Sequence, residues 1–313
     1  MNKQKYIGIS IISPVFQSEE ILDELVLRIK QVLSSINLVY EIILVDDGSS
    51  DNSWSKIEKI SQFDDRIKGI KLSKNFGQSY AISAGLKECK GKCAVVMDCD
   101  LQDNPRYIID LLEKFNTGYD IVLTTAVKRK HNLFKNLTSF IYYRLLNILS
   151  SDKKVKFFQH NTLSLISRKV INSYVQIKDY HRHYLSILKW LGYKSCNISI
   201  THDYRFKGQS SYSVNKMLKL ALDGIISQTD RLLMISIYIG FTFTLLGFIS
   251  IIFIFVKYFT DGFQTGWAST STLIIFSTGL ILSSLGVVGI YIGKIFEQSK
   301  NRPIYIIEKT INI

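Results

Sequence analysis

The sequence predicts an α/β fold with a mostly parallel sheet, followed by two transmembrane helices. Short apolar runs alternate with amphipathic segments between residues 7 and 125, and this alternation is typical of the crossover units of a parallel sheet. Two stretches without a charged residue follow, at 232–256 and 269–293. With 313 residues, 47% of them hydrophobic, the chain can bury one substantial core besides these stretches.

Strands are predicted at short apolar runs, and helices where apolar residues recur three or four positions apart. The predicted strands are Ile7–Val15, Tyr40–Asp46, Ile67–Leu72, Ala94–Asp98, Ile121–Thr125, Leu163–Ile166 and Cys196–His202. The predicted helices are Glu19–Ser34, Trp54–Ile60, Gln78–Cys89, Tyr107–Phe115 and Tyr184–Leu191. The repeated order of strand and helix supports the parallel sheet.

The first apolar run, which follows Lys3 and Lys5, superficially resembles a signal peptide. Pro14 lies inside the run, polar residues 17–20 follow it directly, and no small-residue cleavage pattern is present. These features favour a buried first strand over a signal peptide.

The stretch from Ala94 to Pro105 is the strongest candidate for a functional site. An apolar run ends in Asp98 and Asp100, and a polar turn and a proline that can open a helix come next. Alternate strand residues share a face, and open α/β sheets bind ligands at the carboxyl ends of their strands. The two carboxylates therefore suit one cation that bridges a diphosphate. An Asp-rich turn with a helix cap is the alternative.

A second acid cluster, Asp46 and Asp47, ends an earlier strand within a turn rich in capping residues. Two such clusters fit a nucleotide that is bound through its base and, via a metal, through its diphosphate. Asp46 and Asp51 could instead be turn and cap residues. Neither GxGxxG nor a GxxxxGKS/T loop occurs, so neither a dinucleotide fingerprint nor a phosphate-loop ATPase is supported.

The cysteines and the charge narrow the class of protein. Cys89, Cys93, Cys99 and Cys196 form no CxxC pair and have no matching histidine spacing, so no zinc site is expected and reduced thiols fit a cytosolic setting. A net charge of +13 would attract nucleic acid, anionic lipid or phosphorylated substrates alike, so the location of the charge must decide.

Much of the charge falls in residues 128–156, which hold eight Lys or Arg and one acid, with apolar residues at three- and four-residue spacings. A basic, aromatic and amphipathic segment suits the membrane interface. An ordinary surface helix on the core is the alternative. RNA binding is disfavoured because no nucleic-acid module accompanies the segment.

Each of the two uncharged stretches would form about 37 Å of helix against a hydrocarbon core of about 30 Å, so both are predicted to span a membrane. Residues 257–268 between them carry one Lys, whereas the outer flanks carry three and four Lys or Arg. By the positive-inside rule both termini face the cytoplasm. Spans without ionisable residues make a poor transport path.

The predicted organisation follows from these features. It comprises a cytoplasmic domain at 1–211, a juxtamembrane amphipathic helix at 212–231, the spans at 232–256 and 269–293, and a cytoplasmic tail at 294–313.

Several short motifs, in this order, make the chain similar to glycosyltransferase family two. The resemblance is closest to the membrane-anchored polyprenyl-phosphate glycosyltransferases related to dolichyl-phosphate mannose synthase and the bactoprenol glucosyltransferases. The motifs are Pro14-Val15-Phe16, Val45-Asp46-Asp47-Gly48-Ser49, Leu72-Ser73-Lys74-Asn75-Phe76-Gly77, Ala84-Gly85-Leu86, Asp98-Cys99-Asp100-Leu101-Gln102-Asp103, Trp190-Leu191-Gly192-Tyr193, Arg205-x-x-Gly208-x-Ser210 and Leu222-Asp223-Gly224-Ile225. They extend over nearly the whole chain.

The resemblance implies a GT-A fold, a nucleotide-sugar donor and a Mg²⁺ or Mn²⁺ cofactor. The implied metal ligands are Asp98, Asp100 and Gln102. The residues implied to bind the nucleotide sugar or its metal are Pro14, Asp46, Asp47, Lys74, Asp98, Gln102, Lys207 and Ser210. The implied catalytic residues are Asp100, Arg129 and Arg205, with the arginines near the donor and acceptor phosphates. Arg129 could instead belong only to the basic interfacial face.

Three places depart from the family pattern. Asn161-Thr162 stand where the family usually has Gly-Asp, whose Asp is a candidate base; Ala126 replaces an arginine, and Leu185-Ser186 replace Arg-Gly. A phosphate monoester is largely dianionic at neutral pH, so it can attack an anomeric carbon without a base. A hydroxyl acceptor would need the missing carboxylate.

The sequence thus predicts an integral enzyme of the bacterial inner membrane. It would transfer one hexose or N-acetylhexosamine from a cytosolic UDP-sugar to undecaprenyl phosphate, with inversion, for modification of cell-envelope glycans. A transferase acting on a hydroxyl of a lipid-linked saccharide is one alternative, and a catalytically silent membrane scaffold is another. The subfamily resemblance makes a homo-oligomer plausible, and no nucleic-acid partner is expected.

Overall fold

The computed structural model describes residues 8–36, 38–126, 160–180, 182–201, 231–261 and 266–313. The chain divides into two compact units. One comprises residues 1–131, 156–211 and 302–313, and the other comprises residues 132–155 and 212–301.

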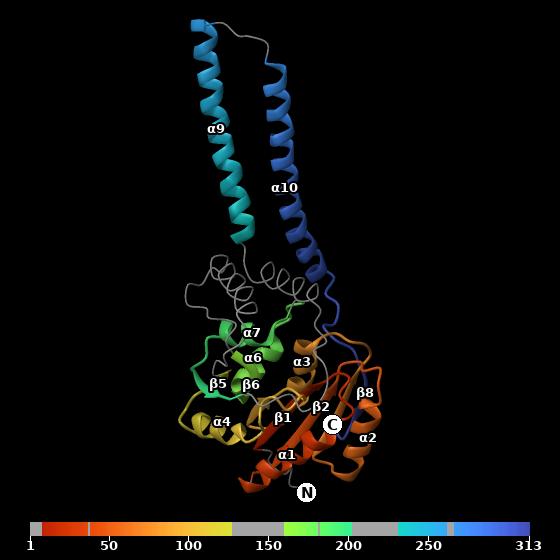
Figure 1. Cartoon of the computed structure of the whole chain (residues 1–313). Helices are drawn as coiled ribbons and strands as arrows, with labels where there is room; N and C mark the ends of the chain where they lie inside the picture. Colours follow the sequence, from red (N-terminus) through yellow and green to blue (C-terminus); the bar gives the residue numbers. More distant parts are fainter. Residues whose placement is uncertain (1–7, 37, 127–159, 181, 202–230, 262–265) are drawn as a thin grey trace. The chain divides into compact units, whose positions relative to one another are not determined.

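The first unit is built on one sheet, which has eight strands within the described residues (Figure 1). The strands are β1 (Ile9–Val15), β2 (Tyr40–Asp46), β3 (Ile67–Leu72), β4 (Cys93–Val96), β5 (Ile121–Ala126), β6 (His160–Ser167), β7 (Ser195–Ile200) and β8 (Ile307–Ile311). Their order is β7-β5-β6-β4-β1-β2-β3-β8. The strands from β4 to β3 pair in parallel, as do β5 and β7, whereas β6 and β8 pair antiparallel with their neighbours. The predicted mostly parallel sheet is therefore confirmed.

Helices cover both faces of this sheet. On one face lie α1 (Leu22–Ser35), α2 (Ser53–Phe63) and α4 (Tyr107–Asn116); on the other lie α3 (Gln78–Glu88), α6 (Arg168–Gln176) and α7 (Tyr184–Trp190). Alternate strand residues point to opposite faces, so Ile11 packs in the first core and Ile12 in the second. Because both faces are covered, β1 and β2 are buried at every position, and most of their residues are apolar.

The C-terminal residues return to the sheet. Residues 294–313 were predicted to form a cytoplasmic tail, but β8 pairs antiparallel with β3 at the sheet edge. The Asn312 side chain donates to the carbonyls of Ser61 and Ile67, at 2.8 and 2.9 Å. Only two of the five β8 residues are apolar, so the strand depends on the long-range partner that β3 provides.

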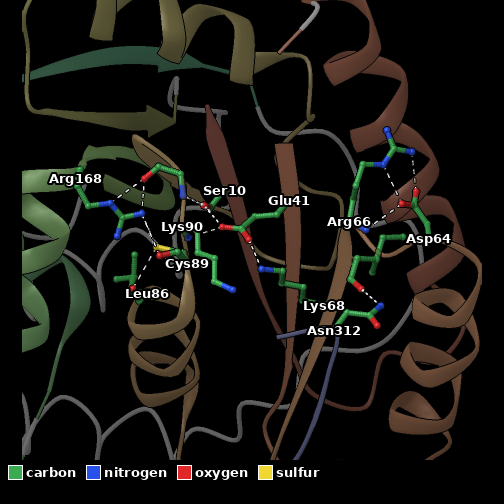
Figure 2. Close-up of polar contacts among 12 residues, drawn as sticks. Ser10, Glu41, Asp64, Arg66, Lys68, Leu86, Cys89, Lys90, Arg168 and Asn312 are labelled. Carbon is green, nitrogen blue, oxygen red and sulfur yellow. Dashed lines mark hydrogen bonds and ion pairs between the residues drawn. The ribbon is translucent and has the colours of Figure 1, made fainter. Parts of the chain in front are cut away.

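A buried ion pair ties three of the parallel strands together near their amino ends (Figure 2). Glu41 on β2 and Lys68 on β3 are 1% and 6% exposed, and their charged groups lie 2.6 Å apart. Glu41 also accepts hydrogen bonds from the Ser10 hydroxyl on β1 and the Lys90 backbone N–H, each at 2.5 Å. Both carboxylate oxygens are therefore used, as a buried charge requires.

The second unit contains two long helices, α9 (Arg231–Asp261) and α10 (Trp267–Ser299), which pack in part through the rings of Phe243 and Phe276, 5.4 Å apart. Among the described residues one helix segment is long and apolar enough to cross a membrane, Phe276–Ser299 in α10, with a mean hydropathy of 1.8. The predicted span at 269–293 is thus confirmed as a candidate, with its bounds shifted. The span predicted at 232–256 is not matched, because the apolar stretch found in α9 is the shorter Leu233–Ile249.

Replacing Glu41 by Gln should destabilise the first unit by about 3–5 kcal/mol, because Lys68 would remain as a buried cation without its counter-charge. Thermal unfolding in detergent, followed by near-UV circular dichroism, measures the effect. Glu24→Gln is the matched control, since Glu24 pairs with Arg28 on the surface of α1 and should contribute less than about 0.5 kcal/mol. Equal effects of the two variants would contradict the structural role of the buried pair.

Candidate active site

Both predicted acid clusters lie at the carboxyl edge of the parallel strands. Asp46 ends β2 opposite Val15 of β1, and the chain leaves β4 toward Asp98 on the other side of β1. The strand order reverses direction here, since β2 and β3 extend from one side of β1 and β4 from the other. Open α/β sheets bind ligands in the crevice outside such a point.

Pro14 explains where β4 stops. The Met97 N–H donates to the Ile12 carbonyl at 3.0 Å, and the next bond of this ladder would need an N–H from residue 14. Proline has none, so β4 ends at Val96 and the chain is released before Asp98. The prediction that the strand extends to Asp98 was therefore wrong by two residues, and both acids belong to the loop.

Asp47 holds the β3–α3 loop against the end of β2. Its two carboxylate oxygens accept the backbone N–H groups of Phe76 and Gly77, each at 2.8 Å. Burial raises the pKa of Asp47 to about 6, against the opposing effect of these hydrogen bonds. Gly48 lets the loop approach, because its φ is 67° and a Cβ there would lie 2.3 Å from the carbonyl carbon of Lys74.

Asp46 is fully buried, and one of its two carboxylate oxygens accepts a hydrogen bond. Oδ1 accepts the Ser49 N–H at 3.2 Å, whereas no hydrogen-bond donor in the described part of the chain reaches Oδ2. Burial raises the pKa of Asp46 despite the contact with Ser49. A buried carboxylate oxygen without a donor is costly, so this position favours a ligand that brings an N–H or O–H group.

Hydrogen bonds join three loops at this edge. The backbone N–H groups of Gln17 and Ser18, after β1, donate to the hydroxyls of Ser49 and Ser53 after β2, both at 3.0 Å. The Cys99 thiol, between the two predicted metal ligands, donates to the Ser18 hydroxyl at 3.2 Å. Burial raises the pKa of Cys99 to about 11, so the thiol stays protonated as a donor.

Three carboxylates gather after β4, which concentrates negative charge there. Burial, together with the charges of Asp100 and Asp103, raises the pKa of Asp98 to about 7. Burial and the charge of Asp100 raise the pKa of Asp103 to about 7 as well. Oxygen ligands at a site of excess negative charge suit a divalent cation, which would favour the ionised forms.

Leu101 shapes the turn that carries these acids. Its φ is 58°, an uncommon conformation for leucine, and its side chain is 2% exposed within the core. The Asp100 carboxylate accepts the Gln102 N–H at 3.1 Å within the same turn. Anchoring by Leu101 therefore holds Asp100 and Gln102 in a strained backbone, as is common at ligand sites.

The described residues contain no group of three His, Cys, Asp or Glu side chains placed to hold a metal ion together. A cation at Asp98 and Asp100 would therefore need further oxygen ligands, such as an amide, water or phosphate. Mg²⁺ is usually bound in this way, through one or two carboxylates and the phosphates of a substrate. The donor set fits such a cation and does not form a complete protein cage.

The structure places seven of the predicted site residues along this edge of the sheet, in β1, at the end of β2 and in the loops after β2, β3 and β4: Pro14, Asp46, Asp47, Lys74, Asp98, Asp100 and Gln102. Arg129, Arg205, Lys207 and Ser210 lie outside the described residues, as do the basic segment 128–156 and the juxtamembrane helix predicted at 212–231.

Sequence reasoning missed Gln78 and gave Thr162 and Asp103 no role in the site. The Gln78 side-chain amide donates to Asp98 Oδ1 at 2.5 Å and lies 3.4 Å from the Thr162 hydroxyl. Gln78 opens the helix after a parallel strand, and this position at the carboxyl edge was the available signal. The contact with Thr162 required the antiparallel pairing of β6, which the sequence did not indicate.

Comparison with known proteins identifies glycosyltransferases as relatives of this chain. Residues 10–175 match the sequence profile of Glycosyl transferase family 2. The uncharacterized glycosyltransferase YkcC of Bacillus subtilis is 35% identical over 99% of this chain and 96% of its own length. The undecaprenyl-phosphate 4-deoxy-4-formamido-L-arabinose transferase of Pseudomonas fluorescens is 28% identical over 97% of this chain and 89% of its own.

Among solved structures, the glucosyl-3-phosphoglycerate synthase of Mycobacterium tuberculosis, in complex with Mn²⁺, UDP and phosphoglyceric acid, matches with a TM-score of 0.50. The match covers 70% of this chain and 76% of that one, at 17% sequence identity. This likeness concerns the fold, which is of the GT-A type predicted above.

The acid clusters predict a pH-dependent stability for the metal-free protein. The native pKa values of about 7 for Asp98 and Asp103 and about 6 for Asp47 exceed the ordinary value of 3.8. At pH values between the ordinary pKa and the native pKa, the native state binds more protons than the unfolded state, so the free energy of unfolding falls as pH rises. Melting temperatures of wild type and Asp98→Asn, measured with chelator from about pH 5 to about pH 8, should show a steeper fall for wild type.

Added Mn²⁺ should recover part of the loss at the higher pH, because the cation binds the ionised carboxylates. A wild-type slope no steeper than that of Asp98→Asn would contradict the assigned charge cluster.

Proposed function

The chain belongs to glycosyltransferase family 2, and on that premise we propose that it transfers a single hexose or N-acetylhexosamine from a UDP-sugar to undecaprenyl phosphate, with inversion. Its glycosyltransferase activity follows from the family. The observation that carries it is the position of two acid clusters at the carboxyl ends of β2 and β4, on either side of β1: Asp46 and Asp47 are buried, whereas Asp98 and Asp100 are partly buried.

The Asp46 cluster would bind the nucleoside. Asp46 Oδ2 is buried and lacks a donor in the described part of the chain, so it suits the imide N–H of a uracil base. Pro14 and Asp47 lie beside it at the ends of β1 and β2 and would line the same pocket. Lys74, in the loop that Asp47 holds, would approach the phosphates.

The second cluster would hold the diphosphate through a cation. Asp98, Asp100 and Gln102 would bind Mg²⁺ or Mn²⁺, and phosphate oxygens of the donor would complete the coordination. A divalent cation there supplies Lewis acidity to the departing nucleoside diphosphate. Binding of the cation requires that Asp98 and Asp100 be ionised when the donor binds.

Thr162 supports a phosphate acceptor. It lies beside Asp98 and Gln78, and its side chain is a neutral hydroxyl that cannot serve as a general base at neutral pH. A dianionic phosphate monoester needs none, since it attacks without losing a proton. Alignment and charge control then become the main requirements, and Arg129, Arg205, Lys207 and Ser210 are proposed to supply them by binding the donor and acceptor phosphates.

The membrane helix candidate supports a lipid-linked acceptor. Phe276–Ser299 places apolar surface in the same chain as the acid clusters, and the 28% identical Pseudomonas protein is named for transfer to undecaprenyl phosphate. We infer a cytoplasmic catalytic domain, a membrane anchor that includes the span at Phe276–Ser299, and an interfacial segment at 128–156, in the bacterial inner membrane.

The direct test incubates purified protein with labelled UDP-sugars, undecaprenyl phosphate and Mn²⁺, and measures label in the lipid fraction. Transfer to the bare lipid phosphate is the expected outcome. Product with a lipid-linked saccharide but none with the bare phosphate would instead assign a hydroxyl acceptor. Absence of metal-dependent UDP binding in calorimetric titration would favour a catalytically silent scaffold.

Asp100→Asn should lower turnover more than about a hundredfold, equivalent to about 3 kcal/mol of transition-state stabilisation, because it removes a charge from the diphosphate site. The melting temperature should stay unchanged, since Asn can still accept the Gln102 N–H within the turn. Steady-state kinetics at saturating Mn²⁺ measure the loss. Turnover within about threefold of wild type would show that Asp100 serves the turn alone.

A further inference from the structure

We propose that Gln78 is a positioning residue for the Asp98 carboxylate and, through it, for the divalent cation. This inference rests on the proposed function, because the cation site at Asp98 is part of it. The Gln78 side-chain nitrogen, Nε2, donates to Asp98 Oδ1 at 2.5 Å and lies 3.4 Å from Thr162 Oγ1. The Thr162 hydroxyl also contacts the Asp98 carboxylate. One amide group thus joins the start of α3 to the loop after β4 and to β6.

The chemistry of these groups fixes the direction of the contacts. An ionised carboxylate only accepts hydrogen bonds, so the amide nitrogen of Gln78, and not its oxygen, must face Asp98. The Thr162 hydroxyl can donate to the carboxylate and accept from the amide at the same time. The three side chains therefore have one consistent arrangement when Asp98 is charged.

The backbone of Gln78 is held independently of its side chain. Asp47 accepts the N–H groups of Phe76 and Gly77, the two residues before Gln78, and Gly77 adopts a φ of 113° that favours glycine. Gln78 itself is exposed and is the first residue of α3. Replacing its side chain should leave the fold intact, so that an effect on cation binding can be separated from unfolding.

A neutral donor suits this task for an electrostatic reason. A carboxylate has about four lone-pair sites, so contacts from Gln78 and Thr162 leave capacity for a cation. The amide orients the carboxylate without cancelling its charge, and the full attraction for the cation remains. Groups that orient metal-binding side chains in this way typically contribute about 10–100-fold in metal affinity.

The test measures Mn²⁺ binding to the full-length protein with UDP and without any acceptor, using the electron paramagnetic resonance signal of free Mn²⁺. Gln78→Leu, which keeps the size but removes the donor, should raise the Kd for Mn²⁺ about 10–100-fold. Thr162→Val should raise it less, and Thr162→Ser, which keeps the hydroxyl, should match wild type. Gln31→Leu, at an exposed position on α1, is the matched control and should have no effect.

A Kd for Gln78→Leu within about twofold of wild type would overturn the positioning role. An equal rise in Gln31→Leu, or a loss of affinity accompanied by a lower melting temperature, would overturn it as well. The proposed acceptor is tested separately. If Gln78→Leu weakens Mn²⁺ binding but wild type transfers no sugar to undecaprenyl phosphate, the transfer proposal fails while the positioning role stands.

Discussion

The contact on which the site depends is the pair of hydrogen bonds from the Phe76 and Gly77 N–H groups to the Asp47 carboxylate. These bonds connect the end of β2 to the start of α3. They use both oxygens of a buried acid, so the Asp47 carboxylate is compensated by dipoles and not by a cation. Because Gln78 follows directly and donates to Asp98, one short loop links the acids at the end of β2 to the acids after β4.

The charges of the acidic side chains are compensated in two different ways. Glu41 is paired with Lys68 and accepts two further hydrogen bonds, so its charge is fully compensated within the protein. Asp98 and Asp103 instead lie close to another carboxylate, and their pKa values rise to about 7. The first arrangement stabilises the sheet. The second leaves an excess of negative charge that a cation can neutralise, and such uncompensated charge is typical of functional sites.

Much of the fold could be predicted because its signals are local. Tyr40–Asp46 and Ile67–Leu72 were predicted to the residue, since each has apolar residues over the length of a strand and is bounded by polar turns, and both become internal parallel strands. The α6 helix and β8 were missed. The Ile307–Ile311 segment carries three polar residues among its five, so its own pattern is weak and its pairing with β3 spans most of the chain.

The sequence by itself determined that two acid clusters lie at the ends of strands, because strand ends and turns can be predicted from local residue patterns. It therefore predicted Asp46, Asp47, Asp98 and Asp100 as site residues. Only the tertiary structure decided how they are held. Strand β4 ends because Pro14 lacks the N–H group that the next hydrogen bond of the ladder needs. Gln78, at the start of α3, contacts Asp98 in the loop after β4 and Thr162 on β6. Such contacts join residues 20 and 84 positions apart, and no local pattern encodes a partner at that distance.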